Sequence, residues 1–263
     1  MHKYLFFLKQ YWQNMLTYRL SFMLWRLREF TSSLMALTVW QVIFANQEVV
    51  FGYQRNQIMA YVFLSTILHN LIATSSLNNL AGDIYSGKIS TTLVKPVNIF
   101  LAWGFQDLAD KLLNFGFVLL ESSLLFFIFK PTFNFPSFEI GLVFILWTLL
   151  AVLISFIINI LFGMIGFWSP DAWGPKFLFF MLLDFTAGKL YPLDILPVII
   201  QKIINYTPFP YLSYFQTQLF LGRFPTQQIF TTTLIMLSWI IGLSLFLKII
   251  WNKGIKNYTA MGQ

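Results

Sequence analysis

Long apolar runs constrain the fold of this chain more than any other feature. Residues 140–166 contain no charged side chain, and similar runs recur along the sequence. A helix needs about 20 mostly apolar residues to cross the roughly 30 Å hydrocarbon core of a bilayer. Only 10% of the residues are charged, whereas a soluble domain carries about 25% and needs them to cover its surface. The sequence therefore predicts an integral membrane protein.

Six such runs are expected to be transmembrane helices, so the predicted fold class is an all-α polytopic membrane protein. They are residues 22–46, 57–80, 105–129, 140–166, 176–188 and 228–250. The fifth run is short and needs flanking residues, or a thinner membrane, to reach across. Twelve of the 17 lysines and arginines fall on the side of the N-terminus. This asymmetry predicts that both termini are cytoplasmic, in a multi-pass protein of the plasma (inner) membrane of a bacterium.

The first 20 residues have the pattern of an amphipathic helix. Apolar side chains from Tyr4 to Leu16 recur at steps of three and four residues, and Lys9, Gln13 and Thr17 fall on the other side. We expect this helix to lie in the inner membrane interface, with its Trp and Tyr at headgroup depth. The alternative is a short soluble helix packed on a partner.

Several chemistries are excluded or disfavoured. Cysteine is absent, which removes disulfides, thiolate metal sites and cysteine nucleophiles. His2 and His69 are too few for a histidine metal site. Residues 82–88, GDIYSGK, fit a nucleotide phosphate-binding loop, but Ile89 stands where Ser or Thr is required and a membrane span precedes the loop. We therefore expect no catalytic residue, no metal and no cofactor on this chain. The charge of +7 is attributed to cytoplasmic loops, and no nucleic-acid partner is expected.

Two carboxylates are expected at membrane depth, Glu121 in the third run and Asp184 in the fifth. A charge at the bilayer centre costs at least about 2.5 kcal/mol, so both should face the interior of the bundle or water. Either they belong to a substrate or ion pathway, or they hold helices together through hydrogen bonds. A proton-coupled carrier would also need such groups, but carriers commonly show internal repeats, and none is visible here.

Residues 186–226 interrupt the apolar pattern with five of the ten prolines. Proline blocks helix continuation. Between Pro197 and Pro208, four isoleucines fall on one face of a short amphipathic helix: Ile199, Ile200, Ile203 and Ile204. The segment predicts a re-entrant hairpin at the outer face. Backbone of this kind is tolerated at membrane depth only where it is buried in protein or lines a cavity.

Two stretches resemble the signatures of a known family. Gly188, Tyr191-Pro192-Leu193, Leu196-Pro197 and Thr207-Pro208-Phe209-Pro210-Tyr211 resemble the outer segment of ABC-2-type transporter permeases. Residues 82–98, GDIYSGKISTTLVKPVN, resemble the cytoplasmic segment between spans two and three of that family, which docks on an ATPase. The N-terminal helix is similar to the interfacial helix of the family.

The resemblance implies one transmembrane domain over residues 1–263. Its parts are an interfacial helix at 1–20, a cytoplasmic coupling segment at 81–100 and an outer re-entrant hairpin at 186–226. The residues carried over to ATPase coupling are Asp83, Gly87, Lys88, Leu93, Lys95 and Pro96. Those carried over to an outer gate are Gly188, Tyr191, Pro192, Pro197, Pro208 and Pro210.

The resemblance also implies a function: a non-catalytic permease subunit of an ATP-driven transporter that exports a hydrophobic or amphipathic substrate such as a lipid, drug or peptide. The implied partners are an ABC ATPase subunit, which holds ATP and Mg²⁺, a second six-helix permease, identical or related, and membrane lipid. Two alternatives stay open: a proton-coupled secondary transporter that uses Glu121 and Asp184, and a membrane enzyme or scaffold.

Overall fold

Helices make up 77% of the chain in the computed structural model, as lipid requires of a backbone that must satisfy its own hydrogen bonds. The structure describes residues 2–169, 173–256 and 258. In these residues, three helices are long and apolar enough to cross a membrane: Ile99–Phe129, Phe138–Phe167 and Thr226–Lys256. Thirty helical residues extend about 45 Å, more than the hydrocarbon core requires. The chain is a helical membrane protein.

In the described residues, six helices form the bundle. These are α2 (Arg19–Ile43), α3 (Arg55–Ile72), α6 (Ile99–Phe129), α7 (Phe138–Gly163), α8 (Trp173–Thr186) and α11 (Ile229–Lys256). The other α-helices are α1 (His2–Thr17), α4 (Leu80–Tyr85), α5 (Ser90–Leu93), α9 (Val198–Asn205) and α10 (Tyr214–Phe220). Four 3-10 turns complete the helical elements: η1 (Met164–Phe167), η2 (Leu193–Ile195), η3 (Pro210–Leu212) and η4 (Thr226–Gln228).

The remaining three predicted spans correspond to α2, α3 and α8, which differ from simple apolar spans. Four charged residues stand in the first half of α2, namely Arg19, Arg26, Arg28 and Glu29. The predicted second span runs to residue 80, but α3 ends at Ile72. The 14 residues of α8 extend only about 21 Å. Six crossings therefore stay a prediction.

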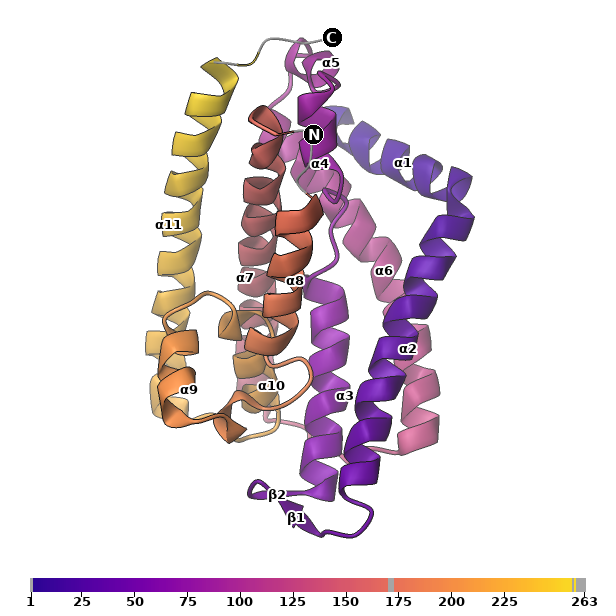
Figure 1. Cartoon of the computed structure of the whole chain (residues 1–263), viewed down its shortest axis with the longest axis vertical. Coiled ribbons are helices and arrows are strands. Elements are labelled where there is room, and N and C mark those ends of the chain that lie inside the picture. Colours follow the sequence, from indigo (N-terminus) through magenta and orange to yellow (C-terminus); the bar gives the residue numbers. More distant parts are fainter. Residues whose placement is uncertain (1, 170–172, 257, 259–263) are drawn as a thin grey trace.

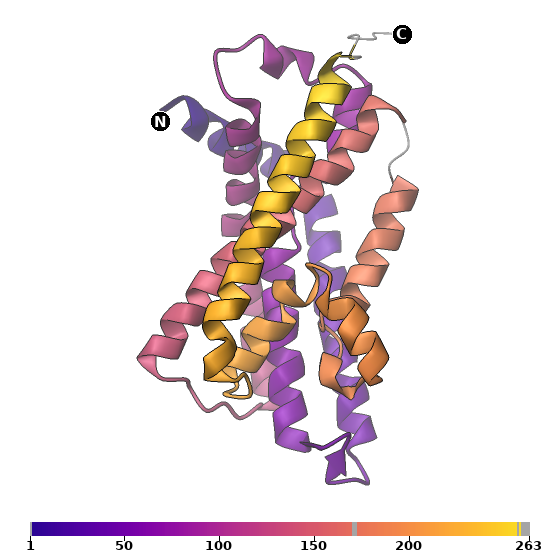
Figure 2. The same cartoon turned by 90° about the vertical axis from the view of Figure 1, so that its left-hand side faces the viewer.

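The two ends of the bundle carry different elements (Figures 1 and 2). α1, α4, α5 and the last turns of α11 lie at one end, which we call the α5 end. The small sheet of β1 (Val49–Val50) and β2 (Tyr53–Gln54) lies at the opposite end with α9 and α10, and we call it the α9 end. The chain thus starts and finishes its helical part at the same end of the bundle.

The core of the bundle centres on α7. Trp147 is fully buried, and its indole Nε1 donates a 2.8 Å hydrogen bond to Oγ1 of Thr233 on α11. A second apolar cluster joins α2, α3 and α6 around Tyr61. A third joins α4, α6, η1 and α11 around Trp103. These contacts fix α3 and α7 as the frame on which the less regular segments rest.

The segment after α8 folds back against this frame. The amphipathic helix predicted after Pro197 is present as α9, but its apolar face is turned away from the bundle: Ile204 is buried, whereas Ile199 and Ile203 are 73% and 63% exposed. α10 was not foreseen in the sequence, and it packs on α3 and α7 with Gln216 and Thr217 fully buried. The part of this segment that enters the bundle is therefore α10.

Candidate functional site

Four consecutive backbone carbonyls after α8 are each held by a side chain from another part of the fold. Ser213 Oγ donates to Ala187 O at 2.6 Å, and Tyr61 Oη donates to Gly188 O at 2.7 Å. Ser65 Oγ donates to Lys189 O at 2.8 Å, and Trp40 Nε1 donates to Leu190 O at 2.7 Å. The donors come from α2, α3 and the turn before α10. They satisfy the carbonyl groups of a non-helical backbone, which would be costly to leave unpaired inside a membrane.

Residues 187–190, which carry these carbonyls, form a strip in which glycine is required at one position. Gly188 has a φ of +75°, and a Cβ placed there would lie 2.7 Å from Tyr61 Oη and 3.0 Å from Tyr214 Cβ. The backbone conformation and the close approach of the tyrosine both favour a residue without a side chain. The strip therefore packs closely between α3 and α10.

A second anchor holds the hairpin near η2. Tyr53 Oη donates to both carboxylate oxygens of Asp194, at 2.8 and 2.7 Å, and Gln218 Nε2 donates to Tyr53 Oη at 3.2 Å. Burial, with the nearby Asp194 carboxylate, raises the pKa of Tyr53, so its hydroxyl stays a donor. The Arg223 guanidinium lies 3.8 Å from the centre of the Tyr53 ring. β2, η2 and α10 thus meet at one tyrosine.

The remaining residues assigned to an outer gate lie around these anchors. Tyr191 is half-buried and follows the strip directly, while Pro192, Pro208 and Pro210 are buried. Pro197 is exposed and precedes the first turn of α9. The structure brings these six residues into one segment, and their role as a gate stays a prediction.

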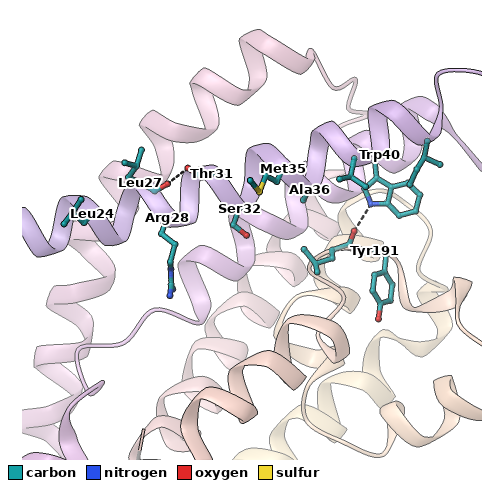
Figure 3. Close-up of a pocket in the computed structure, with 12 residues that line it drawn as sticks. Leu24, Leu27, Arg28, Thr31, Ser32, Met35, Ala36, Trp40 and Tyr191 are labelled. Carbon is teal, nitrogen blue, oxygen red and sulfur yellow. Dashed lines mark hydrogen bonds between the residues drawn. The ribbon is translucent and has the colours of Figure 1, made fainter. Parts of the chain in front are cut away.

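An apolar groove of about 810 Å³ runs along α2. Figure 3 shows its lining residues from Leu24 and Arg28 at one end to Trp40 and Tyr191 at the other. Leu27, Met35 and Val39 form much of its wall and are all more than half exposed. Leu190 and Tyr191 line the groove at the end where Trp40 lies.

A polar cavity of about 480 Å³ lies between α2, α3 and α8. It is lined by cations, carboxylates and aromatic rings, and Arg28 and Ser32 belong to its lining as well as to that of the groove. The two spaces therefore meet at one turn of α2.

The carboxylates of the polar cavity face cations from separate elements. Asp184 Oδ1 lies 3.0 Å from His69 Nε2 and 3.6 Å from Lys189 Nζ. Glu29 lies 3.6 Å from Lys189 and accepts a 2.6 Å hydrogen bond from Arg28. This network connects α2, α3, α8 and the strip that follows α8.

Glu121 lies elsewhere. Its carboxylate pairs with the buried guanidinium of Arg26, which also donates to Asn114 Oδ1 at 3.3 Å. The pair joins α2 to α6 and does not line either the groove or the polar cavity. The two carboxylates assigned together to a pathway are thus separated: Asp184 lies in the polar cavity, and Glu121 lies in a helix contact.

The predicted coupling segment forms an exposed tip at the α5 end. Lys88 and Asp83 pair at 3.1 Å with the Lys88 side chain 70% exposed, and Gly87 turns the chain with a φ of +77°. Leu93, Lys95 and Pro96 are exposed, as is the neighbouring Val94 at 84%. Leu93 and Val94 thus place two adjacent apolar side chains at the surface of this end.

The base of this segment is packed tightly against the end of α7. A Cβ added at Gly166 would lie 2.1 Å from the carbonyl oxygen of Ala81, and one at Gly163 would lie 2.3 Å from Leu80. α4 therefore rests directly on the backbone of η1 and the last turn of α7. The turn before α4 is held by Asp107, which accepts a 2.6 Å hydrogen bond from Ser75 Oγ.

α1 lies along the first half of α6. Tyr4 stacks on Phe105 with ring centres 5.5 Å apart, and Trp12 Nε1 donates to Ala109 O at 2.8 Å. Tyr11 Oη donates to Asp110 Oδ1 at 2.5 Å. Burial and the Asp110 carboxylate raise the pKa of Tyr11, so this contact keeps its proton on the tyrosine.

Sequence reasoning identified the strip but missed the side chains that hold it. Trp40, Tyr53, Tyr61, Ser65 and Ser213 read as ordinary membrane or loop residues. Their partners lie 26 to 150 positions away in the sequence, so no local pattern connects them. Within the described part of the chain, no group of three His, Cys, Asp or Glu side chains is arranged to hold a metal ion.

Comparison with known proteins agrees with this architecture. A family model described as ABC-2 family transporter protein matches residues 30–262, which include every bundle helix except the first turns of α2, together with both irregular segments. No curated protein matches the chain. The family supplies the non-catalytic membrane subunit of transporters and associates with an ABC ATPase subunit. The chain belongs to the ABC-2 family of transporter proteins and is a permease component of an ABC transporter.

Proposed function

We propose that the chain is the six-span permease of an ATP-driven exporter for a hydrophobic or amphipathic substrate. The family match over residues 30–262 carries this proposal, because it fixes the transporter class. A separate ATPase would hold ATP and Mg²⁺ and would dock at the α5 end, which is then the cytoplasmic end. Both termini are cytoplasmic in this arrangement, and the membrane is the plasma (inner) membrane of a bacterium.

The coupling segment, 81–100, is the proposed ATPase contact. Its exposed tip at Leu93, Val94 and Lys95 supports docking, and the close packing of Ala81 on Gly166 supports transmission of movement into α7. Without the close packing at the base, a movement of the tip would not be transmitted to the rest of the bundle. With both features, a movement of the exposed tip would be transmitted through α4 to the end of α7.

The hairpin, 186–226, is the proposed outer gate. The carbonyls of residues 188–190 accept hydrogen bonds from side chains of α2 and α3. Movement of α2 or α3 would therefore carry the strip with it. In this account the substrate passes along the face of α2, α3 and α8, with a second permease, identical or related, facing the apolar groove.

Transport by the reconstituted complex tests this function. The chain is purified with its co-purifying subunits, placed in liposomes, and transport is measured with ATP, without ATP and with a proton ionophore. The proposal predicts transport that requires ATP and resists the ionophore. Transport that needs no ATP and collapses with the proton gradient would establish a secondary carrier instead. A lipid-modifying activity in the chain alone would establish an enzyme.

A further inference from the structure

The apolar groove and the polar cavity adjoin along α2, so that a charged space lies next to an apolar one. Arg28 and Ser32 line both, and Lys189 of the cavity is followed directly by Leu190 of the groove. Their volumes, about 480 and 810 Å³, lie within the roughly 300–1,000 Å³ typical of small-ligand sites. A ligand that fills both must have a polar head and an apolar body.

The polar end carries more cations than carboxylates. Its lining contains Arg28, Lys176 and Lys189 against Glu29 and Asp184. Lys189 is buried and faces both carboxylates at 3.6 Å. That cation is therefore already neutralised inside the protein.

The charges of the other two cations are less fully neutralised. The Arg28 side chain is 69% exposed and has one carboxylate neighbour, Glu29. Lys176 Nζ donates to Asn78 O and Oδ1 at 3.2 Å and to Leu77 O at 3.5 Å, and no carboxylate pairs with it in the described ranges of the chain. A guanidinium offers a planar fork and an ammonium a point charge, a combination suited to the oxygens of an acidic head group.

The cavity also provides apolar surface next to the charges. The Lys176 ammonium lies 5.6 Å from the centre of the Phe180 ring, and the Arg28 guanidinium lies 5.8 Å from that of Trp25. Trp173 and Phe177 stack with their ring centres 5.2 Å apart. These rings line the polar cavity together with its cations.

We propose that this space binds the transported substrate as a small amphiphile with one acidic head group, placed between Arg28 and Lys176 with its apolar body along α2. The inference rests on the proposed function and adds the chemical class of the substrate. It assigns Arg28 and Lys176 as specificity residues.

Binding of matched probes tests the inference. Radiolabelled dodecyl phosphate is titrated onto the purified chain, with its co-purifying subunits, in phosphatidylcholine nanodiscs, and binding to empty discs is subtracted. Dodecanol and dodecyltrimethylammonium, which share the tail, serve as competitors. We expect saturable binding that unlabelled dodecyl phosphate displaces and that the neutral and cationic probes do not displace. Equal competition by dodecanol would overturn the inference, because the site would then recognise only the tail.

Variants localise the charge recognition. Arg28→Gln and Lys176→Gln should each raise the Kd for dodecyl phosphate about tenfold, through loss of one charge-assisted hydrogen bond. Lys202→Gln removes an exposed lysine of α9 far from the cavity and should leave the Kd unchanged. Substitution of both cavity cations by Glu should reverse the preference toward the ammonium probe. Equal loss in Lys202→Gln would contradict the assignment, and so would unchanged binding in both cavity variants that elute as the wild type.

Two further results separate this inference from the proposed function. If phosphatidylglycerol in the disc displaces the probe as well as dodecyl phosphate does, the space is a site for bulk lipid and the substrate assignment is wrong. If the complex hydrolyses ATP and exports only neutral or cationic compounds, the exporter stands and the acidic class is wrong. If the chain binds dodecyl phosphate specifically but transports without ATP, the binding site stands and the proposed ATP-driven exporter is wrong.

Discussion

The outer hairpin and the coupling segment are both irregular interruptions of a helical bundle, but they are held in different ways. The hairpin is held by side-chain donors on its backbone carbonyls, from Ser213, Tyr61, Ser65 and Trp40. The coupling segment is held by steric contact at its base, Ala81 on Gly166, and its tip is exposed. A segment inside a membrane must satisfy its backbone within the protein, whereas one in water needs only a firm base. Substitutions in the two segments should therefore lower folding stability to different extents.

The largest effect is expected for Gly166→Leu. A side chain at this position would have to displace the Ala81 backbone, whose carbonyl oxygen lies 2.1 Å from the Cβ position. Overpacking of this kind costs about 1–3 kcal/mol or more, so the Tm of the purified chain should fall and ATP hydrolysis should become independent of substrate. Gly141→Leu, in the first turn of α7 with open space around it, is the control. Equal Tm values for the two variants would show that the base is not fixed by steric contact.

Gly188→Ala should have the next largest effect. The substitution combines a left-handed backbone with a Cβ 2.7 Å from Tyr61 Oη, and we expect a loss of about 1–3 kcal/mol. Gly222→Ala is a matched control, because Gly222 has a φ of +69° and nothing within 4 Å of its Cβ position. The difference in denaturation midpoint between these variants measures the close contact alone. Equal denaturation midpoints would show that Gly188 is needed only for its left-handed backbone and not for the close contact with Tyr61.

Tyr53→Phe should loosen the hairpin by about 1–2 kcal/mol, since it removes the hydroxyl that donates to Asp194 and accepts from Gln218. Hydrogen exchange of residues 193–205 should accelerate, while that of α6 should not change. Tyr206→Phe, at a tyrosine that is 84% exposed, should leave both unchanged. Acceleration spread evenly over the chain would contradict a local anchor at Tyr53.

The smallest effect on stability is expected at the tip of the coupling segment. Val94→Ser removes an apolar side chain that is 84% exposed, so the free energy of unfolding should change by less than about 0.5 kcal/mol. Association with the ATPase should nevertheless weaken, which is measured by co-purification yield. Val198→Ser makes the same change at an exposed site on α9 and should not alter that yield. A lower Tm of Val94→Ser with unchanged ATPase association would contradict this prediction, because the tip would then stabilise the fold and not bind the ATPase.

Much of the architecture could be predicted from the sequence because it depends on local composition. The 140–166 run became α7 with little change, and the isoleucine spacing after Pro197 predicted α9. α10 was missed because its seven residues include two glutamines and a threonine, which weaken the apolar pattern. These polar side chains are buried by tertiary contacts, such as that of Gln216 Nε2 with Trp147 O at 3.3 Å.

The candidate site was less predictable because it depends on contacts between distant residues. Glu121 and Asp184 read alike in the sequence as carboxylates inside apolar runs. Only the fold separates them, since Arg26 reaches Glu121 from 95 positions away, while Asp184 opens into the polar cavity. Arg28, adjacent to Glu29 in sequence, was visible only as a charge near the end of a span. Its position where the groove and the cavity meet could be seen only once the fold had placed α8 beside α2.

Cross-linking tests most directly whether the coupling segment at the α5 end docks an ATPase. Because the sequence contains no cysteine, Val94→Cys and Val198→Cys each introduce a single thiol for a photoactivatable cross-linker. The account predicts that Val94→Cys links the chain to a stoichiometric companion that carries a complete phosphate-binding loop, and that Val198→Cys does not. A chain that purifies alone, or a companion that links equally from both positions, would contradict the account.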